Sequence, residues 1–480
     1  MPRPTISLLS KNDIELIHEK ALEVLEVIGV RIESRRVVNL LKSYGLEVSE
    51  GNVVKFPRDL VESKVKDCPH EFTLYDREGK PRLLVGGDRT YFNPGSAATK
   101  ILDLRQNTIR DPTLWDLRDI AILVNELENI DAQSTAVVPH EFPPETRDRV
   151  RLYPLLKYST KPIVTGAFTV DGVHDMVKLL SIFISDLDKR PIAIFDVCPS
   201  PPLKWSEVTV ENLVDCAKYG LPIEIISMPS LGATSPVTIA GALVQHHAEV
   251  LSGIVIAQLV RKGVPVVYGG SPSTFDMRYG TPNIVAPEAL LVSLAYVEIA
   301  KYLNLLTHTY MALSDTILLD YQSGVETGIS ALVACLRGIN VVSGPGMLEH
   351  ESTQCLEKLV LDNEVCGLVR RFSRGFNIGI EELAIDLLRD VGPGGTFLSK
   401  KHTVKHFKKE IYHPHILLRY DMREWMRRGS PSLLERAKQE VEQLLKRGTR
   451  ELPPSDLLQE LNRAINGILR KFGITVRELP

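Results

Sequence analysis

A regular alternation of short apolar runs and amphipathic stretches occupies the middle of this 480-residue chain. Seven such runs recur from residue 131 onward, and a helix-like pattern separates each run from the next. The runs are Asp131–Val138, Pro162–Phe168, Pro191–Val197, Pro222–Met228, Val264–Tyr268, Leu305–Tyr310 and Ile339–Val342. This alternation is typical of parallel βαβ units, and continuously apolar strands indicate a sheet that is covered on both faces.

The number of units favours a closed barrel over an open sheet. The runs are not accompanied by the glycine-rich fingerprint of a dinucleotide-binding doubly wound sheet. A closed barrel needs an eighth strand, and we expect it near Gly395–Leu398. The sequence therefore predicts an α/β fold, a (β/α)8 TIM barrel, over residues 111–400.

The two ends of the chain have a different character from the middle. Residues 1–110 contain two short amphipathic segments, Ser10–Val27 and Ser34–Ser43, followed by alternating segments such as Thr90–Phe92 that resemble hairpins. We expect an N-terminal α+β appendage there. Residues 401–480 are helical in pattern and charged, and we expect a C-terminal helical extension that wraps the barrel, with a role in an interface as the second choice.

Composition excludes several classes of protein. The chain has 57 basic and 60 acidic residues, which argues against nucleic acid as a partner. Its six cysteines form no CxxC pair, so we expect neither a metal site nor a disulfide framework, and free thiols suit the cytoplasm. The first residues lack the apolar segment of a signal peptide. The sequence contains no run of 18 apolar residues, so we expect no membrane span.

Candidate functional residues lie where the predicted strands end, because a barrel's active site forms at the carboxyl ends of its strands. The last run ends in Ser-Gly-Pro-Gly, and glycine and proline recur at the other ends. The residues that carry chemistry are the aromatics Phe168, Tyr268 and Tyr310, the acids Asp196, Glu224 and Glu349, and the histidines His308 and His350. Basic residues do not cluster there, so a phosphate substrate is not expected.

Aromatic faces together with carboxylates suit a small organic cation. A quaternary ammonium group is attracted to the face of each ring by about 0.5–2 kcal/mol. Asp196 and Glu224 interrupt otherwise apolar strands, and a buried carboxylate is costly unless it is paired or used. Each aromatic residue, and also His308, could instead belong to the core. The pattern thus predicts an anionic, aromatic mouth but does not name a reaction.

Six segments add a resemblance to a known family. They read YFNPGS (residues 91–96), TKPIVTGA (160–167), MPSLGATSPVT (228–238), GMLE (346–349), LDNE (361–364) and VGPGGTFL (391–398). In sequence and in order they resemble the trimethylamine methyltransferase family, the corrinoid-dependent amine methyltransferases. The resemblance implies the same (β/α)8 barrel that the strand pattern predicts.

The resemblance also implies a reaction, in which a methyl group moves from a methylated amine to the Co(I) corrinoid of a partner protein. The corrinoid (cobalamin) then belongs to that partner, and none is tightly bound by this chain. Some members use pyrrolysine, whereas every position here is a standard residue. The resemblance therefore favours the branch without pyrrolysine, similar to glycine betaine:corrinoid methyltransferase, whose quaternary substrates release a neutral amine. We also expect a homo-oligomer, since closed symmetric assemblies are common.

The resemblance gives the candidate residues their expected roles. Asp196, Glu224, Glu349 and His350 are the catalytic candidates, of which the first two balance the substrate's charge and the last two lie on the rim. The substrate-binding candidates are Tyr91, Phe92, Phe168, Tyr268, His308 and Tyr310. Two alternatives stay open: a non-catalytic barrel that binds quaternary amines, and a barrel lyase resembling uroporphyrinogen decarboxylase, which would need arginines at its mouth.

Overall fold

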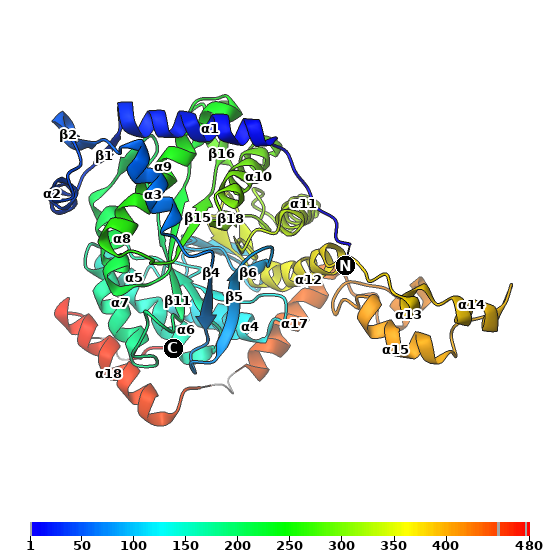
Figure 1. Ribbon diagram of the computed structural model, residues 1–480. Helices are drawn as coiled ribbons and strands as arrows, with labels where there is room; N and C mark the ends of the chain where they lie inside the picture. The colour runs from blue at the N-terminus through cyan, green and yellow to red at the C-terminus, as the bar shows by residue number, and fades with distance from the viewer. Residues whose placement is uncertain (1, 449–451, 476–477) are drawn as a thin grey trace.

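The computed structural model describes residues 2–448, 452–475 and 478–480, and its centre is a barrel of eight parallel strands (Figure 1). Around the barrel the strands follow one another in the order β6-β19-β18-β15-β13-β11-β10-β9. Their bounds are β6 Tyr91–Asn93, β9 Gln133–Ser134, β10 Ile163–Thr165, β11 Ala193–Val197, β13 Ile223–Ser227, β15 Val266–Gly270, β18 Leu306–Tyr310 and β19 Val341–Ser343. The N–H of Asp131, just before β9, donates to the carbonyl of Phe92 in β6 at 2.7 Å and nearly closes the ring. The predicted (β/α)8 barrel is therefore confirmed.

The eighth strand is not where the sequence predicts it. Residues 395–398 form no strand, and β6 supplies the missing strand by pairing in parallel with β19, Val341 opposite Tyr91. A three-residue strand among hairpins gives no sign in the sequence that its partner lies about 250 residues away. The barrel therefore begins inside the segment predicted as the appendage, and its last helix, α12 (Leu356–Ser373), ends well before residue 400.

Helices cover the outside of the barrel and connect its strands, as the sequence predicts. They are α4 (Leu114–Glu126), α5 (Arg147–Val150), α6 (Leu152–Tyr158), α7 (Gly172–Ser181), α8 (Glu207–Tyr219), α9 (Ile239–Val260), α10 (Pro287–Tyr302), α11 (Tyr321–Arg337) and α12. Local signals fix their ends: a capping box of Thr113 and Asp116 starts α4, and left-handed glycines, Gly220 and Gly338, end α8 and α11. Among the described residues, α9 alone is long and apolar enough to cross a membrane, and most of it is buried in the protein.

An apolar plug seals the amino-terminal end of the barrel. The hairpin of β4 (Glu71–Tyr75) and β5 (Pro81–Gly86) lies across this end, in front of the barrel strands in Figure 1. Its Leu74, Leu83 and Val85 form one buried cluster with inward side chains of the barrel, among them Ile194 and Val267. Small molecules must therefore enter the barrel from its carboxyl end.

The N-terminal appendage packs on the helical layer. Helix α1 (Lys11–Glu23) starts at a capping box of Ser10 and Asp13 and lies on α9 and α10. Helix α2 (Arg35–Ser43) confirms the helix predicted at Ser34–Ser43. Helix α3 (Arg58–Lys66) is a further helix that the sequence did not predict. A small sheet joins β1 (Val30–Ile32), β2 (Val48–Ser49) and β3 (Val53–Val54) to β12 (Lys204–Trp205).

Short strands extend the carboxyl end of the barrel, where the loops after the barrel strands gather. One sheet joins β14 (Ser230–Leu231), β16 (Ser273–Asp276) and β17 (Thr281–Asn283). Another joins β7 (Lys100–Asp103), β8 (Thr108–Arg110), β20 (Met347–Leu348) and β21 (Thr353–Gln354). These strands frame the opening of the barrel.

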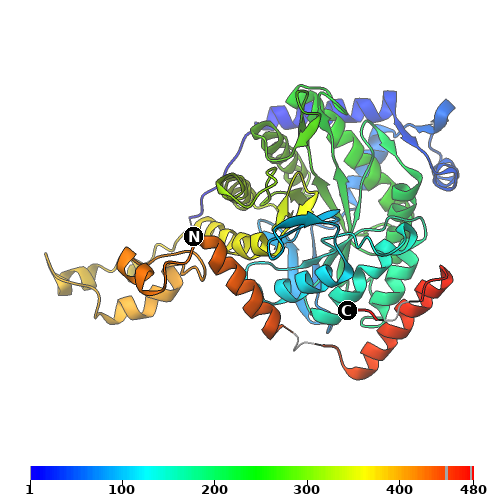
Figure 2. The same ribbon diagram turned by 180° about the vertical axis from the view of Figure 1, so that it is seen from behind.

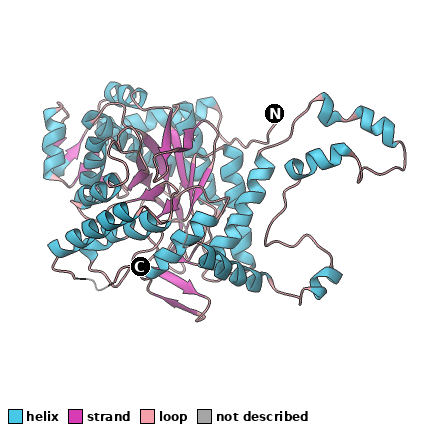
Figure 3. Ribbon diagram, turned by 90° about the horizontal axis from the view of Figure 1, so that it is seen from below, coloured by secondary structure: helices cyan, strands magenta, loops and turns pink. Residues whose placement is uncertain are grey.

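The C-terminal region is helical and only partly wraps the barrel. Helix α17 (Leu433–Arg447) packs on α4 and α12, and α18 (Ser455–Lys471) packs on α6 and α7. Most of residues 374–432, with α13 (Ile380–Leu383), α14 (Ile385–Val391), α15 (Lys401–Glu410) and α16 (Met422–Arg427), instead projects away from the barrel (Figures 2 and 3), whereas Ile416 is buried against it. We call residues 374–432 the arm.

Close backbone packing explains the glycine that follows β19. A Cβ at Gly344 would overlap the carbonyl oxygen of Met311, in the chain that follows β18. We predict that Gly344→Ala lowers the free energy of unfolding by about 2–3 kcal/mol, as overpacking of a close contact does. Gly324, in α11, has open space around it, so Gly324→Ala is expected to leave stability unchanged or to raise it by up to about 1 kcal/mol. Chemical denaturation measures both, and equal stabilities would contradict the contact.

Candidate active site

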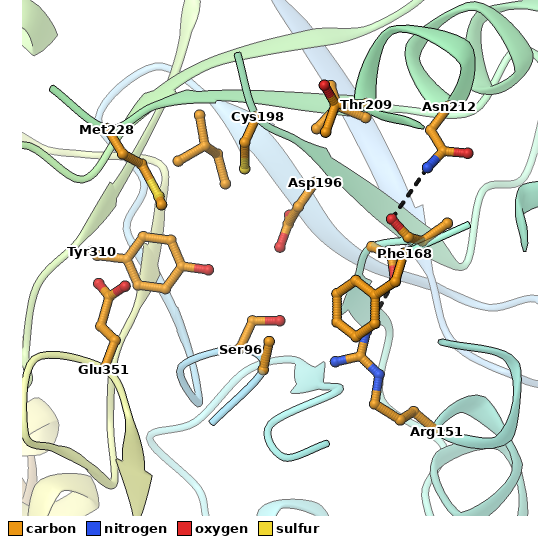
Figure 4. A pocket seen from close by; sticks show the side chains of 15 residues that line it. Ser96, Arg151, Phe168, Asp196, Cys198, Thr209, Asn212, Met228, Tyr310 and Glu351 are labelled. Carbon is orange, nitrogen blue, oxygen red and sulfur yellow. Dashed lines mark hydrogen bonds between the residues drawn. The ribbon is translucent and has the colours of Figure 1, made fainter. Parts of the chain in front are cut away.

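A cavity of about 220 Å³ opens at the carboxyl ends of the barrel strands (Figure 4). Three of the predicted residues line it, namely Phe168, Asp196 and Tyr310. Two residues that the sequence did not single out, Arg151 and Glu351, line it as well. The cavity therefore lies where barrel geometry places an active site.

Strand alternation brings carboxyl groups to the inside of the barrel. Asp196 of β11 faces inward two residues after Ile194, and Glu224 of β13 is level with Asp196 in the strand register. Glycines clear the space beside them. A Cβ at Gly166 would lie 3.1 Å from the carbonyl oxygen of Asp196, and one at Gly269 would lie 2.9 Å from Nδ1 of His308. Polar groups thus occupy a layer that branched apolar residues usually fill.

The two carboxyl groups retain a proton between them. Glu224 is fully buried, and neither of its carboxyl oxygens has a hydrogen-bond donor among the described residues. Burial, and then the neighbouring charge of Asp196, raises the pKa of Glu224 well above its usual range. Burial also raises the pKa of Asp196 to about 7, although Glu224 and Arg151 act in the opposite direction. Adjacent buried carboxylates cannot both ionise cheaply, so near neutral pH the pair carries one negative charge.

His308 lies beside this pair and does not offset its charge. Its Nε2 is 3.1 Å from Oγ of Ser343 and 3.9 Å from Oε2 of Glu224. Burial lowers the pKa of His308 to about 3, so the ring is neutral near pH 7. His308 therefore borders the site from within the barrel, as a neutral polar neighbour of Glu224.

Arg151 supplies the positive charge of the cavity. It lies between α5 and α6, is fully buried, and donates from its two terminal nitrogens to the carbonyls of Thr135 at 2.9 Å and Gly166 at 3.0 Å. Its guanidinium is 4.1 Å from the ring centroid of Phe168, which it holds against the cavity. Burial lowers the pKa of Arg151 to about 10, which still leaves it cationic near pH 7.

Glu351 reaches the cavity through a strained turn. The φ angles of Glu349, His350 and Glu351 are 50°, 53° and 68°, a left-handed run that costs about 1–3 kcal/mol per non-glycine residue. Ser271 Oγ donates to Oε1 of Glu351 at 3.0 Å, and burial raises the pKa of Glu351 to about 8. Strain of this kind persists at functional sites, where the surroundings fix the backbone.

Glu349 and His350, the predicted rim residues, do not line the cavity. Thr353 Oγ1 donates to Oε2 of Glu349 at 2.5 Å, and Nδ1 of His350 is 3.1 Å from Oδ1 of Asp315. Both side chains are therefore engaged in holding the turn that presents Glu351.

Three of the predicted substrate-binding residues lie elsewhere. The side chain of Tyr268 points out of the barrel, because its neighbours Val267 and Gly269 face inward, and its hydroxyl is 2.9 Å from Nδ1 of His247 in α9. The side chain of Phe92, in β6, is buried in the apolar cluster that includes the surrounding helices, with the guanidinium of Arg370 5.0 Å from its ring centroid. Tyr91 lies at the plugged end and donates to the carbonyl of Leu84 at 3.2 Å. These three residues, predicted to bind substrate, therefore do not line the cavity.

The cavity lining combines charged groups and aromatic faces with one buried thiol. Burial raises the pKa of Cys198, which lines it, to about 12, so this thiol is not a nucleophile near neutral pH. What the cavity offers is a carboxylate, Asp196, aromatic walls from Phe168 and Tyr310, and the charge of Arg151. Fold and site together define a TIM-barrel protein with a charged, partly aromatic cavity at the carboxyl ends of its strands.

Comparison with known proteins assigns the chain to a family. The family model for trimethylamine methyltransferase (MTTB) matches residues 1–471. The chain belongs to this family and is a methyltransferase.

Several relatives cover most of the chain. The glycine betaine methyltransferase of Desulfitobacterium hafniense strain Y51 is 32% identical over 416 residues, 86% of each protein. The trimethylamine methyltransferase MttB of Methanosarcina barkeri strain Fusaro is 32% identical over 479 residues, 97% of this chain and 96% of the relative. The crystal structure of the M. barkeri monomethylamine methyltransferase MtmB matches with a TM-score of 0.54 at 11% identity, covering 98% of this chain and 90% of that one, which supports the fold.

The single charge on the carboxyl pair leads to a prediction about binding of methylated cations. Asp196→Asn removes the charge that faces the cavity, so we expect at least tenfold weaker binding of tetramethylammonium and glycine betaine. Glu224→Gln keeps a neutral side chain beside Asp196, and we expect less than a threefold change. Isothermal titration calorimetry measures both.

The pH dependence of binding follows from the same groups. Asp196 is neutral below its raised pKa of about 7, so the affinity of the wild type should fall by about tenfold per pH unit below that value. The Asp196→Asn variant should lose most of this dependence. An unchanged pH profile in Asp196→Asn would contradict the assignment.

Proposed function

We propose that this protein transfers a methyl group from a quaternary methylated amine that also bears a carboxylate, such as glycine betaine, to the Co(I) corrinoid of a partner protein. The observation that carries the proposal is the pairing of charges in one cavity. Asp196, with one negative charge shared with Glu224, and Arg151, with one positive charge, both line it. The similarity to the glycine betaine methyltransferase of D. hafniense strain Y51 supports the same substrate class.

The aromatic residues suit the methylated nitrogen. Phe168 is 41% exposed at the cavity, and Tyr310 stands across the cavity with its hydroxyl pointing inward in Figure 4. Asp196 points into the space between them. A quaternary nitrogen placed there would contact both ring systems and one carboxylate, the combination that stabilises a desolvated organic cation.

Charge balance distinguishes a zwitterion from a simple cation. Before substrate enters, the charges of Arg151 and of the Asp196–Glu224 pair cancel. A betaine adds one positive and one negative charge and preserves that balance, with its carboxylate toward Arg151. Tetramethylammonium would leave a net positive charge in a partly buried cavity, which is unfavourable.

The residues of this chain need to bind, orient and exclude water. The corrinoid of the partner supplies the nucleophile when it is bound. Loss of a methyl group from a quaternary nitrogen releases a neutral tertiary amine, so no proton has to be donated. Phe168 and Tyr310 would direct one N-methyl toward the mouth, and the plug formed by β4 and β5 keeps water from entering at the other end. Glu224 keeps its proton, so Asp196 remains charged.

The barrel lyase is the weaker alternative, because a polyanionic substrate would require several arginines and, among the described residues, Arg151 is the one arginine that lines the cavity. Cytoplasmic location and assembly into a homo-oligomer stay predictions from the sequence.

The proposed reaction can be followed directly. We expect the protein, mixed with Co(I) cobalamin and glycine betaine, to form methylcobalamin, detected by its absorbance, at least tenfold faster than with trimethylamine. Phe168→Ala should reduce the rate at least tenfold, whereas Phe376→Ala, which removes an exposed phenylalanine from the arm, should not change it. Binding of glycine betaine without any methylcobalamin would instead indicate a non-catalytic binder.

The role of Arg151 has its own test. Arg151→Met removes the positive charge, so we expect glycine betaine to bind at least tenfold more weakly and tetramethylammonium to bind no more weakly than in the wild type. Arg151→Lys keeps the charge and should keep the preference for glycine betaine. Calorimetry measures the affinities, and melting temperatures check folding. Parallel loss of both ligands in a folded Arg151→Met protein would contradict recognition of the carboxylate.

A further inference from the structure

Exposed apolar side chains of the barrel concentrate at its carboxyl end. Within described residues 2–373, four large apolar side chains are more than two-thirds exposed: Val237 (69%), Met277 (76%), Tyr279 (77%) and Tyr321 (88%). Each belongs to the segment between the carboxyl end of a barrel strand and the first turn of the next helix. Apolar side chains gathered on one exposed surface mark sites of interaction.

Two of these residues stand on a hairpin that is built directly on the strand ends. Strand β14 begins three residues after β13 ends, and β16 begins three residues after β15 ends. The pairing of Ser230 with Ser273, reinforced by a 3.0 Å hydrogen bond between their hydroxyls, ties the two extensions together. Met228, in the link between β13 and β14, lines the cavity itself. The hairpin of β16 and β17 therefore stands at the edge of the cavity.

The tip of this hairpin is ordered and presents apolar groups. Arg278 donates to both carboxylate oxygens of Asp276, at 3.0 and 2.7 Å, so the two charges of the tip neutralise each other. The N–H of Gly280 donates to the carbonyl of Asp276 at 2.7 Å and closes the turn. The side chains of Met277 and Tyr279 are left facing solvent.

A second loop adds to the same surface. The side chains of Val237, between β14 and α9, and of Met277 both lie beside Gly232. Each would be 3.6 Å from a Cβ at that position, so the two side chains converge there. We call Met228, Val237, Met277 and Tyr279 the mouth patch. It runs from the wall of the cavity to the tip of the hairpin.

We propose that the mouth patch docks the corrin macrocycle of the methyl-acceptor protein, an inference that rests on the proposed function. The other end of the barrel is sealed by its plug, so an acceptor must reach the bound methyl group through this mouth. A corrin is a broad disc with methyl-bearing faces and a rim of carboxamides. Polarisable thioethers and a tyrosine suit such a surface, since they contact apolar faces and the phenol also meets amides.

The test measures binding of cob(II)alamin and of glycine betaine separately, on the full-length protein, by calorimetry. We expect the double variant M277A/Y279A to raise the Kd for cob(II)alamin at least tenfold and to leave the Kd for glycine betaine within twofold. The matched control M422A/Y44A removes an exposed methionine and tyrosine far from the cavity and should change neither. Light scattering on each variant reports the oligomeric state.

Four results would overturn the docking surface: no binding of cob(II)alamin by the wild type, no change in M277A/Y279A, an equal loss in the control, or a parallel loss of glycine betaine affinity. Dissociation of an oligomer in M277A/Y279A without a change in cob(II)alamin affinity would identify a second copy as the occupant and also overturn it. If cob(II)alamin binding is weakened in M277A/Y279A but the wild type transfers no methyl group from glycine betaine, the result would support the docking role of the mouth patch and contradict the proposed function.

Discussion

Two carboxyl groups lie side by side inside this barrel, at the same level on neighbouring strands. Asp196 faces the cavity and Glu224 is buried behind it, next to a histidine that burial keeps neutral. Removing two negative charges from water without a cation in contact is costly, and the retained proton on the pair relieves that cost. One negative charge therefore remains, and it points into the cavity.

The rest of the site is arranged around that charge. Gly166 and Gly269 leave room for it, and Arg151 offsets it through a guanidinium held by backbone carbonyls and stacked on Phe168. A strained turn adds Glu351, whose raised pKa keeps a second full negative charge from building up near pH 7. A nearly neutral cavity with separated charges suits a zwitterion that carries both signs.

The sequence predicts the barrel well because seven strands and their helices each carry a local pattern, whereas its eighth strand, β6, is defined only by a distant partner. Asp196 and Glu224 were predictable because carboxylates are rare in apolar strands. Tyr268 was misplaced because a shift of one residue along a strand reverses the face of the sheet. The sequence does not identify Arg151 as a site residue, because its pattern is that of an arginine on the surface of a helix. Its position just before the apolar stretch Leu152–Leu156 is the one feature that points to burial. Glu351 reaches the cavity only through a left-handed turn, which the sequence does not predict.

The measurement that tests this account most directly is infrared difference spectroscopy of the carboxyl groups near pH 8, about one unit above the raised pKa of Asp196. The spectrum of the wild type minus that of Glu224→Gln should contain the carbonyl band of one protonated, buried carboxylic acid. The spectrum of the wild type minus that of Asp196→Asn should instead contain the bands of an ionised carboxylate. Two ionised carboxylates in the wild type, or two protonated acids, would contradict the single shared proton on which the cation-binding cavity depends.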